Sequence, residues 1–349
     1  MKKPHLESTY KLFINGEWKE ASDKATYKSY CPANGEVLAE CAQATREDVE
    51  DAITAAWAAF ETWKNVPVNE RAEILNKVAD IIDENREHLA MVETLDNGKP
   101  IRETLNVDIP MAAQHFRYFA GCIMASEGSA NILGKDTLSL ILREPIGVVG
   151  QIVPWNFPFL MAAWKLAPVL ASGCCTVFKP SSSTSLSVLE LARLVQGVIP
   201  RGVFNVITGS GSKSGQYMLE SKRFRKLAFT GSTEVGRNVA LAAAERIIPA
   251  TLELGGKSAN IFFEDCDWEM AMDGLQMGIL FNQGQVCCAG SRVFVQDSIY
   301  DRFVEEAVKR FNAVKVGLPW ESDTQMGCQI SKRQMEKILG YVEIGKKEG

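Results

Sequence analysis

The chain has 349 residues, of which 46% are hydrophobic and 23% are charged, and this ordinary globular composition excludes a disordered chain. A net charge of −5 without any dense Lys/Arg run argues against a nucleic-acid partner and favours a small-molecule ligand. Its nine cysteines are an odd number and the N-terminal residues lack the apolar core of a secretory leader, so we expect a cytoplasmic protein.

Two further classes of protein find little support in the sequence. No Cys-x2-Cys pair or His-bearing ligand cluster is present, so no metal site is expected. The most apolar stretch, residues 146–170, carries Gln151, Asn156, Lys165 and three prolines, which a membrane-spanning helix would not tolerate. We therefore expect no membrane partner.

The N-terminal third alternates between short strands and long helices. Residues 12–42 contain β signals, with Asn15-Gly16 as a hairpin turn and a strand over 37–41. After Thr45, a predicted N-cap, apolar residues recur at helical spacing over three ranges that read as packing helices: 46–63, 69–95 and 104–121. His88 and His115 would lie on packed or solvated faces of them.

Residues 126–145 change character. Gly128 and Gly134 precede an alternating segment, Thr137–Arg143, that predicts a strand. An exposed apolar strand needs a partner, so an oligomerisation role and an ordinary edge strand are both open interpretations.

From residue 147 onward the pattern indicates an α/β fold with a parallel sheet, because strands alternate with helical segments. Strands are predicted to start near Val148, Cys175, Val203, Leu227 and Thr251. Ligands of such sheets bind at the carboxyl ends of the strands. Polar and glycine residues collect at these ends, in 154–158, 179–182, 209–211 and 231–236.

The turn after the fourth of these strands favours a dinucleotide. Gly231 lets a phosphate approach the backbone, and Ser232 opens a predicted helix whose N-terminal amides attract a pyrophosphate. The glycines at 209, 211 and 215 do not match Gly-x-Gly-x-x-Gly, so a packing turn remains an alternative explanation of each glycine turn.

Cys287 is the candidate nucleophile, at the end of a predicted buried helix over 272–281. A thiol becomes reactive when a cation, a helix N-terminus or a base favours its thiolate. No histidine stands in a motif with it, but Glu253 interrupts an apolar strand predicted over 248–254. We expect this carboxyl to be buried, which would raise its pKa toward that of a general base. The alternatives are an inert buried thiol and a nucleophilic Cys288.

Asn156 follows the first strand of the parallel sheet. Its side-chain amide could donate to a developing oxyanion. From the residues alone, an Asx-type turn before Pro158 is the favoured interpretation.

The two motifs Leu252–Ala259 and Gly284–Cys287 together resemble the paired active-site signature of the aldehyde dehydrogenase superfamily. Nearly the whole chain resembles its bacterial, NAD(P)-dependent, non-acylating class, which acts on acetaldehyde and similar small aldehydes. The family pattern places the nucleophile two residues after the Gln, which selects Cys287 over Cys288. It also implies Glu253 as general base and Asn156 as oxyanion donor.

The resemblance implies a Rossmann-type, parallel-sheet cofactor domain over 1–122 and 146–255, an oligomerisation arm over 123–145 and an α/β catalytic domain over 256–349. The implied assembly is a homodimer or homotetramer. The cofactor would be NAD or NADP, held by Ile152, Pro154, Trp155, Lys179, Ser182, Gly211, Gly215, Phe229, Gly231, Ser232 and Leu254. Phe157, Met161 and Trp164 would line an apolar substrate funnel, although core packing explains each of them equally well.

The implied reaction is oxidation of a small aldehyde to its carboxylic acid through a thiohemiacetal and a thioester on Cys287. Acyl transfer to coenzyme A is a rival, but family members of that type lack a Glu at the position of Glu253. Family members also continue well past Gly349 with further strands and a Glu-x-Phe motif. A truncated, non-catalytic NAD(P)-binding fragment is therefore the second hypothesis.

Overall fold

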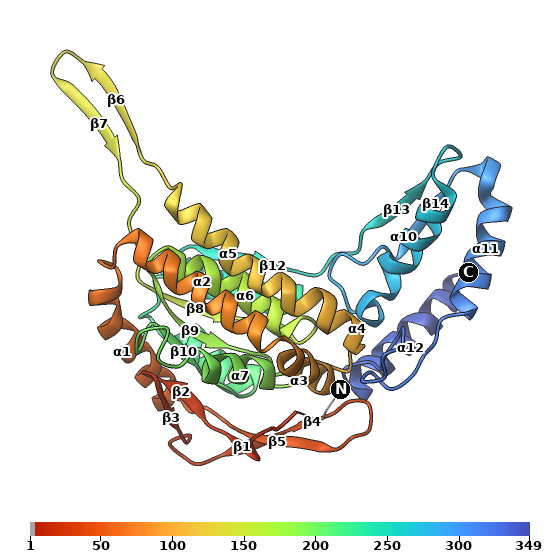
Figure 1. Ribbon diagram of the computed structural model, residues 1–349, viewed down its shortest axis with the longest axis horizontal. Helices are drawn as coiled ribbons and strands as arrows, with labels where there is room; N and C mark the ends of the chain where they lie inside the picture. The colour runs from red at the N-terminus through yellow and green to blue at the C-terminus, as the bar shows by residue number, and fades with distance from the viewer. Residues whose placement is uncertain (1–3) are drawn as a thin grey trace.

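A computed structural model describes residues 4–349 (Figure 1). Its centre is a seven-stranded sheet in the order β12-β11-β8-β9-β10-β2-β3. The five predicted strands are present and run parallel: β8 (Val148–Ile152), β9 (Cys175–Lys179), β10 (Phe204–Val206), β11 (Lys226–Thr230) and β12 (Ala250–Glu253). The four inner members of this set are largely buried, as expected of parallel strands covered on both faces.

The predicted N-terminal hairpin closes the other edge of this sheet. Strands β2 (Leu12–Ile14) and β3 (Glu17–Lys19) are antiparallel, and Asn15 and Gly16 between them have φ of 54° and 73°. Positive φ at both turn residues matches the right-handed strand twist. A separate three-stranded sheet lies beside it, formed by β1 (Thr9–Tyr10), β4 (Thr26–Tyr30) and β5 (Val37–Ala42).

Helices cover the central sheet, and α1 (Arg46–Trp63) packs against β8, β9 and β10. Its predicted N-cap, Thr45, forms a capping box with Asp48. The other helices of this part are α2 (Val68–Glu84), α3 (Arg86–Asn97), α4 (Ile101–Glu103), α5 (Ile109–Met124), α6 (Pro158–Ala171), α7 (Leu186–Leu194), α8 (Gln216–Glu220) and α9 (Thr233–Ala244). Within residues 4–349, no helix is long and apolar enough to cross a membrane.

Two predicted helices differ from the structure. The helix expected over 69–95 is broken at Asn85, which leaves helical geometry between α2 and α3. The one expected over 104–121 begins as a π-helical turn, Thr104–Asp108, and becomes α-helical only at Ile109. Pro110 in the first turn of α5 has no N–H to donate, which interrupts the regular α-helical ladder at this point.

Residues 129–141 form a hairpin of β6 (Ser129–Gly134) and β7 (Thr137–Ile141), not the single strand expected. The hairpin projects from the body of the molecule (Figure 1). Its apolar side chains are open to solvent, with Ile132 84% and Leu133 70% exposed.

Within residues 259–312, a lobe forms around a small core of Met272, Leu275 and Phe303, which is separate from the main core. A parallel pair, β13 (Ala259–Phe262) and β14 (Arg292–Val295), lies beside α10 (Trp268–Leu280) and α11 (Tyr300–Asn312) (Figure 1). The predicted C-terminal helix is α12 (Lys332–Glu348), which has no buried residue.

Candidate active site

Cys287 lies in a tight loop after α10. The chain reverses at Asn282, Gln283 and Gly284, whose φ values are 47°, 55° and 73°. The reversal leads out to Cys287 and Cys288, and both residues are exposed. Cys287 is therefore not an inert buried thiol.

Backbone and side-chain hydrogen bonds join this loop to the segment that follows Glu253. The Gly256 N–H donates to the Cys287 carbonyl at 3.1 Å. Lys257 Nζ donates to the carbonyl of Gly284 at 3.1 Å. The two motifs, which are distant in the sequence, are thus neighbours in the structure.

Glu253 is the last residue of β12, and its side chain is exposed. The expectation of a buried carboxyl is therefore wrong. Among residues 4–349, β12 lies at the edge of the central sheet and three of its four residues are exposed, so no packed layer covers the Glu253 side chain.

Lys165 is a charged group near Glu253 that sequence reasoning did not assign to the site. It is only 8% exposed, and burial lowers its pKa to about 8, while the Glu253 carboxylate acts to raise it. The signal that could have found it is a lysine within the otherwise apolar α6.

The immediate surroundings of the Cys287 thiol raise its pKa on balance. Partial burial raises its pKa above the ordinary value, and the neighbouring Cys288 thiol raises it further, although backbone hydrogen bonds at Cys287 and Cys288 act to lower it. A base must therefore remove the thiol proton before Cys287 can act as a nucleophile near neutral pH.

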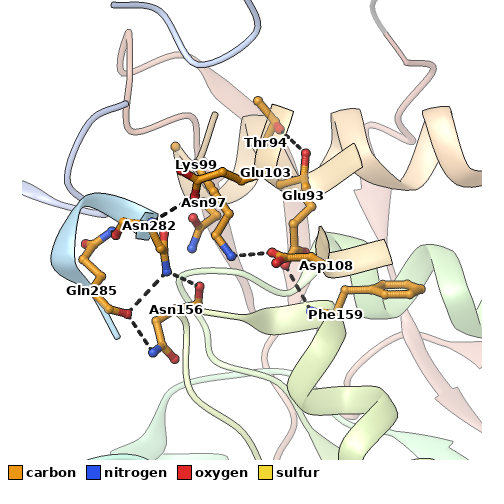
Figure 2. Close-up of polar contacts among 12 residues, drawn as sticks. Glu93, Thr94, Asn97, Lys99, Glu103, Asp108, Asn156, Phe159, Asn282 and Gln285 are labelled. Atoms are coloured by element: carbon orange, nitrogen blue, oxygen red, sulfur yellow. Dashed lines mark hydrogen bonds and ion pairs between the residues drawn. The ribbon is translucent and has the colours of Figure 1, made fainter. Parts of the chain in front are cut away.

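Asn156 reaches across to the loop that carries Cys287, residues 282–288, which is the nucleophile loop (Figure 2). Its side-chain Nδ2 donates to the Gln285 carbonyl at 2.8 Å, and its own carbonyl accepts from Asn282 Nδ2 at 2.6 Å. The Asn156 side chain thus links two segments that are distant in the sequence. It does not form the local Asx-type turn that the residues alone favoured. The bond to Gln285 uses one of the two amide protons, so the other can be donated to a further acceptor.

The three predicted funnel residues have different surroundings. Trp164 is 43% exposed, stacks on His115 and lines a cavity of about 340 Å³ beside Lys165. Phe157 and Met161 are buried, and Phe157 stacks on Phe281 with 5.8 Å between ring centroids. Packing is what the structure shows for these two, and their contact with a substrate remains a prediction.

Three predicted cofactor residues stand in register at the carboxyl ends of neighbouring strands. Ile152 pairs with Lys179 on one side and with Phe229 on the other. The Phe229 ring covers Gly231, where an added Cβ would stand 2.5 Å from it. Gly215 lies against the Lys179 side chain, since a Cβ there would be 3.7 Å from its Cε.

The remaining predicted cofactor residues surround this centre. The Ser232 side chain caps α9 by accepting from the Val235 N–H at 3.4 Å, and Leu254 packs against Gly236 in that helix. The carbonyl of Trp155 accepts from Asn97 Nδ2 at 2.7 Å. Pro154 and Ser182 are half-buried and Gly211 is exposed, in the turns that follow β8, β9 and β10.

The surroundings of Lys179 show whether the carboxyl ends of these strands can hold a polar cofactor. Its side chain is 2% exposed, and burial lowers its pKa to about 8. Among residues 4–349 its ammonium donates only to the Pro180 carbonyl, at 3.1 Å. Two of its three protons therefore remain for a ligand hydroxyl or phosphate, as a nucleotide would require.

Known proteins match this arrangement. The family model described as "Aldehyde dehydrogenase family" matches residues 18–349. Aldehyde dehydrogenase B of Escherichia coli (strain K12) is 49% identical, over 99% of this chain and 68% of that protein. An aldehyde dehydrogenase of Vibrio cholerae is 47% identical, over 99% of this chain and 69% of that protein.

Solved structures agree with the sequence matches. The NAD+ complex of an aldehyde dehydrogenase from Bacillus cereus has a TM-score of 0.96 at 43% identity, and the match covers 100% of this chain and 73% of that one. A putative aldehyde dehydrogenase from Burkholderia cenocepacia gives 0.96 at 40% identity, over 98% and 70% of the two chains. The chain therefore belongs to the aldehyde dehydrogenase family of NAD(P)-dependent oxidoreductases, which oxidise aldehydes to carboxylic acids.

Proposed function

We propose that this chain oxidises a small aldehyde with Cys287 as nucleophile, Glu253 as general base and Asn156 as oxyanion donor. The observation that carries the proposal is the junction at the nucleophile loop. The same few residues are hydrogen-bonded to the segment after Glu253 and to the Asn156 side chain.

The reaction begins when Glu253 accepts the thiol proton and the Cys287 sulfur adds to the aldehyde carbonyl carbon. The resulting oxyanion receives hydrogen bonds from Asn156 Nδ2 and from the Cys287 N–H. Lys179 would hold the nicotinamide cofactor, which would supply the hydride acceptor. Loss of hydride from the former carbonyl carbon leaves a thioester on Cys287.

Hydrolysis completes the cycle. Glu253 removes a proton from water, the water oxygen attacks the thioester carbon, and the carbon–sulfur bond breaks to release the carboxylic acid and the Cys287 thiolate. Exposure of Glu253 gives both water and the departing proton a route to solvent. General-base assistance of this kind typically contributes about 10² to 10⁴ in rate.

Several features of the whole chain belong to the same proposal. Residues 1–122 and 146–255 form the cofactor domain, residues 256–349 belong to the catalytic domain, and the 123–145 arm joins copies into a homodimer or homotetramer. All nine cysteines are free, which suits a cytoplasmic location.

A direct assay tests the function. Protein, NAD or NADP and a panel of short aldehydes are mixed, and formation of reduced cofactor is followed by its absorbance. We expect reduced cofactor and the matching carboxylic acid in equal amounts. Cofactor binding without any product would contradict the proposal and favour a non-catalytic binding protein.

A further inference from the structure

The turn before the nucleophile has an unfavourable backbone. Asn282 (φ 47°, ψ 39°) and Gln283 (φ 55°, ψ 32°) are successive non-glycine residues in the left-handed region. L residues avoid this region unless surrounding contacts hold them there. Both side chains are buried, at 0% and 5% exposure, so the holding contacts are internal.

The contacts that hold this turn come from several segments. Gln283 Nε2 donates to the carbonyls of Gly98 at 3.1 Å and Cys328 at 2.7 Å. The Asn282 N–H donates to Glu103 Oε2 at 2.9 Å (Figure 2). Within residues 4–349, Glu103 is the side chain that accepts a backbone N–H of the left-handed turn.

Glu103 comes from α4, far from Cys287 in the sequence, and is 4% exposed. Burial raises the pKa of its carboxyl to about 7, which the Asn282 N–H, Lys99 and Arg102 oppose and Asp108 reinforces. Lys99 is fully buried, pairs with Asp108 and lies 3.7 Å from the centroid of the Phe157 ring. The Glu103 carboxyl itself contacts the Arg102 guanidinium, with 3.7 Å between Nη2 and Oε1.

The same turn connects to the oxyanion donor. The Asn282 side chain donates to the Asn156 carbonyl at 2.6 Å and to the Gln285 carbonyl at 3.3 Å. Gln285 also accepts from the Asn156 amide. A shift of the Asn282 backbone would therefore move Asn156 relative to Cys287.

We infer that Glu103 is a positioning residue: by accepting the Asn282 N–H, it holds the left-handed turn that sets Cys287 against the Asn156 amide. The inference rests on the proposed nucleophile and oxyanion roles of these two residues. Without Glu103, a buried N–H loses its acceptor, and the turn has reason to relax toward an ordinary backbone.

The test compares Glu103→Ala with Glu103→Gln. The Gln amide keeps an acceptor oxygen at the same reach, whereas Ala removes it. We expect Glu103→Ala to lower the single-turnover rate of cofactor reduction by about 10- to 100-fold, with cofactor affinity unchanged. Glu103→Gln should restore the rate to within about threefold, and amide hydrogen exchange of residues 281–290 should rise in the Ala variant alone.

Asp96→Ala is the matched control. Asp96 is 1% exposed, accepts from the Leu186 N–H at 2.9 Å, and has its pKa raised to about 7 by burial. It therefore shares the burial and stability cost of Glu103 without contacting the turn. If Asp96→Ala slows the single turnover as much as Glu103→Ala, or if Glu103→Ala leaves either the rate or the exchange unchanged, Glu103 is not a positioning residue.

Failure of the proposed function and failure of the role inferred for Glu103 give different results. A Cys287→Ala variant that keeps full turnover would remove Cys287 from the mechanism whatever Glu103 does. Hydrogen exchange in the 281–290 turn needs no turnover, so an unchanged exchange rate in Glu103→Ala overturns the inference even in a protein that lacks activity.

Discussion

At the scale of single residues, the structure shows which of the proposed catalytic groups are accessible and which need a proton removed. The Cys287 thiol is accessible but has a raised pKa, and Glu253 is exposed at the edge of the central sheet. In the proposed mechanism, proton removal by Glu253 is the step that makes the exposed thiol nucleophilic. Motif spacing could indicate Cys287 and Glu253 as a pair. It could not predict that Glu253 is exposed, because exposure depends on which segments pack over the strand.

Replacing Glu253 by Gln tests its role as the hydrolytic base. Hydride transfer precedes attack of water on the thioester, so we expect steady turnover to fall by about 10² to 10⁴ while the first burst of reduced cofactor falls less. Rapid-mixing absorbance measures both phases. Unchanged steady turnover would rule out both proposed roles of Glu253, in hydrolysis and in thiol deprotonation.

Ser182 bears on the choice between NAD and NADP. It stands three positions after Lys179, in the turn that follows β9. A carboxylate there would bind ribose hydroxyls and repel a 2′-phosphate, whereas we expect the uncharged Ser182, with Lys179 nearby, to accept the phosphate. We expect appreciable activity with NADP, and Ser182→Glu should shift the ratio of kcat/KM values toward NAD. A wild-type protein that ignores NADP would show this interpretation to be wrong.

At the scale of elements, sequence patterns predicted the strands and turns that depend on residues close together in the chain. Buried hydrophobic runs predicted the strands of the parallel sheet, and Asn15-Gly16 predicted the hairpin turn. The break at Asn85 and the π-helical turn over 104–108 escaped prediction, because the apolar spacing continues through both. The reversal at Asn282 escaped as well, since long-range partners such as Glu103 hold it.

The β6–β7 hairpin gives an element-scale prediction. Its apolar residues are open to solvent, and an exposed apolar strand pair favours association. We expect Ile132→Asp combined with Leu140→Asp to shift the protein to a smaller assembly, measured by light scattering. Asn131→Asp on the same hairpin is the control, because it adds charge without removing apolar surface. An unchanged mass in the double variant would contradict an oligomerisation arm.

At the scale of the whole molecule, three buried carboxyls predict how stability depends on pH. Burial raises the pKa of Glu93, Asp96 and Glu103 to about 7. Between their ordinary values and about 7, the folded state holds more protons than the unfolded state, so the free energy of unfolding falls as pH rises. The pKa of Glu190 is lowered to about 2, so this carboxylate stabilises the fold near neutral pH and its stabilisation is lost only in more acidic solution.

Urea denaturation at about pH 5 and about pH 8 measures this dependence. We expect the protein to be more stable at the lower pH, by an amount on the order of a few kcal/mol, because one unit of pKa shift corresponds to about 1.4 kcal/mol. Asp96→Asn should reduce the difference. Greater stability at the higher pH would show that these carboxyls do not dominate the titration.

Trapping the acyl-enzyme is the most direct test of Cys287 as the nucleophile. Protein mixed with cofactor and a short aldehyde is quenched in acid during the burst, and mass spectrometry of the digested peptides locates the acyl group. We predict the added acyl mass on Cys287, its absence from Cys287→Ala, and its persistence on Cys287 in Cys288→Ala. An acyl group found on Cys288, or reduced cofactor formed at the normal rate by Cys287→Ala, would contradict the assignment.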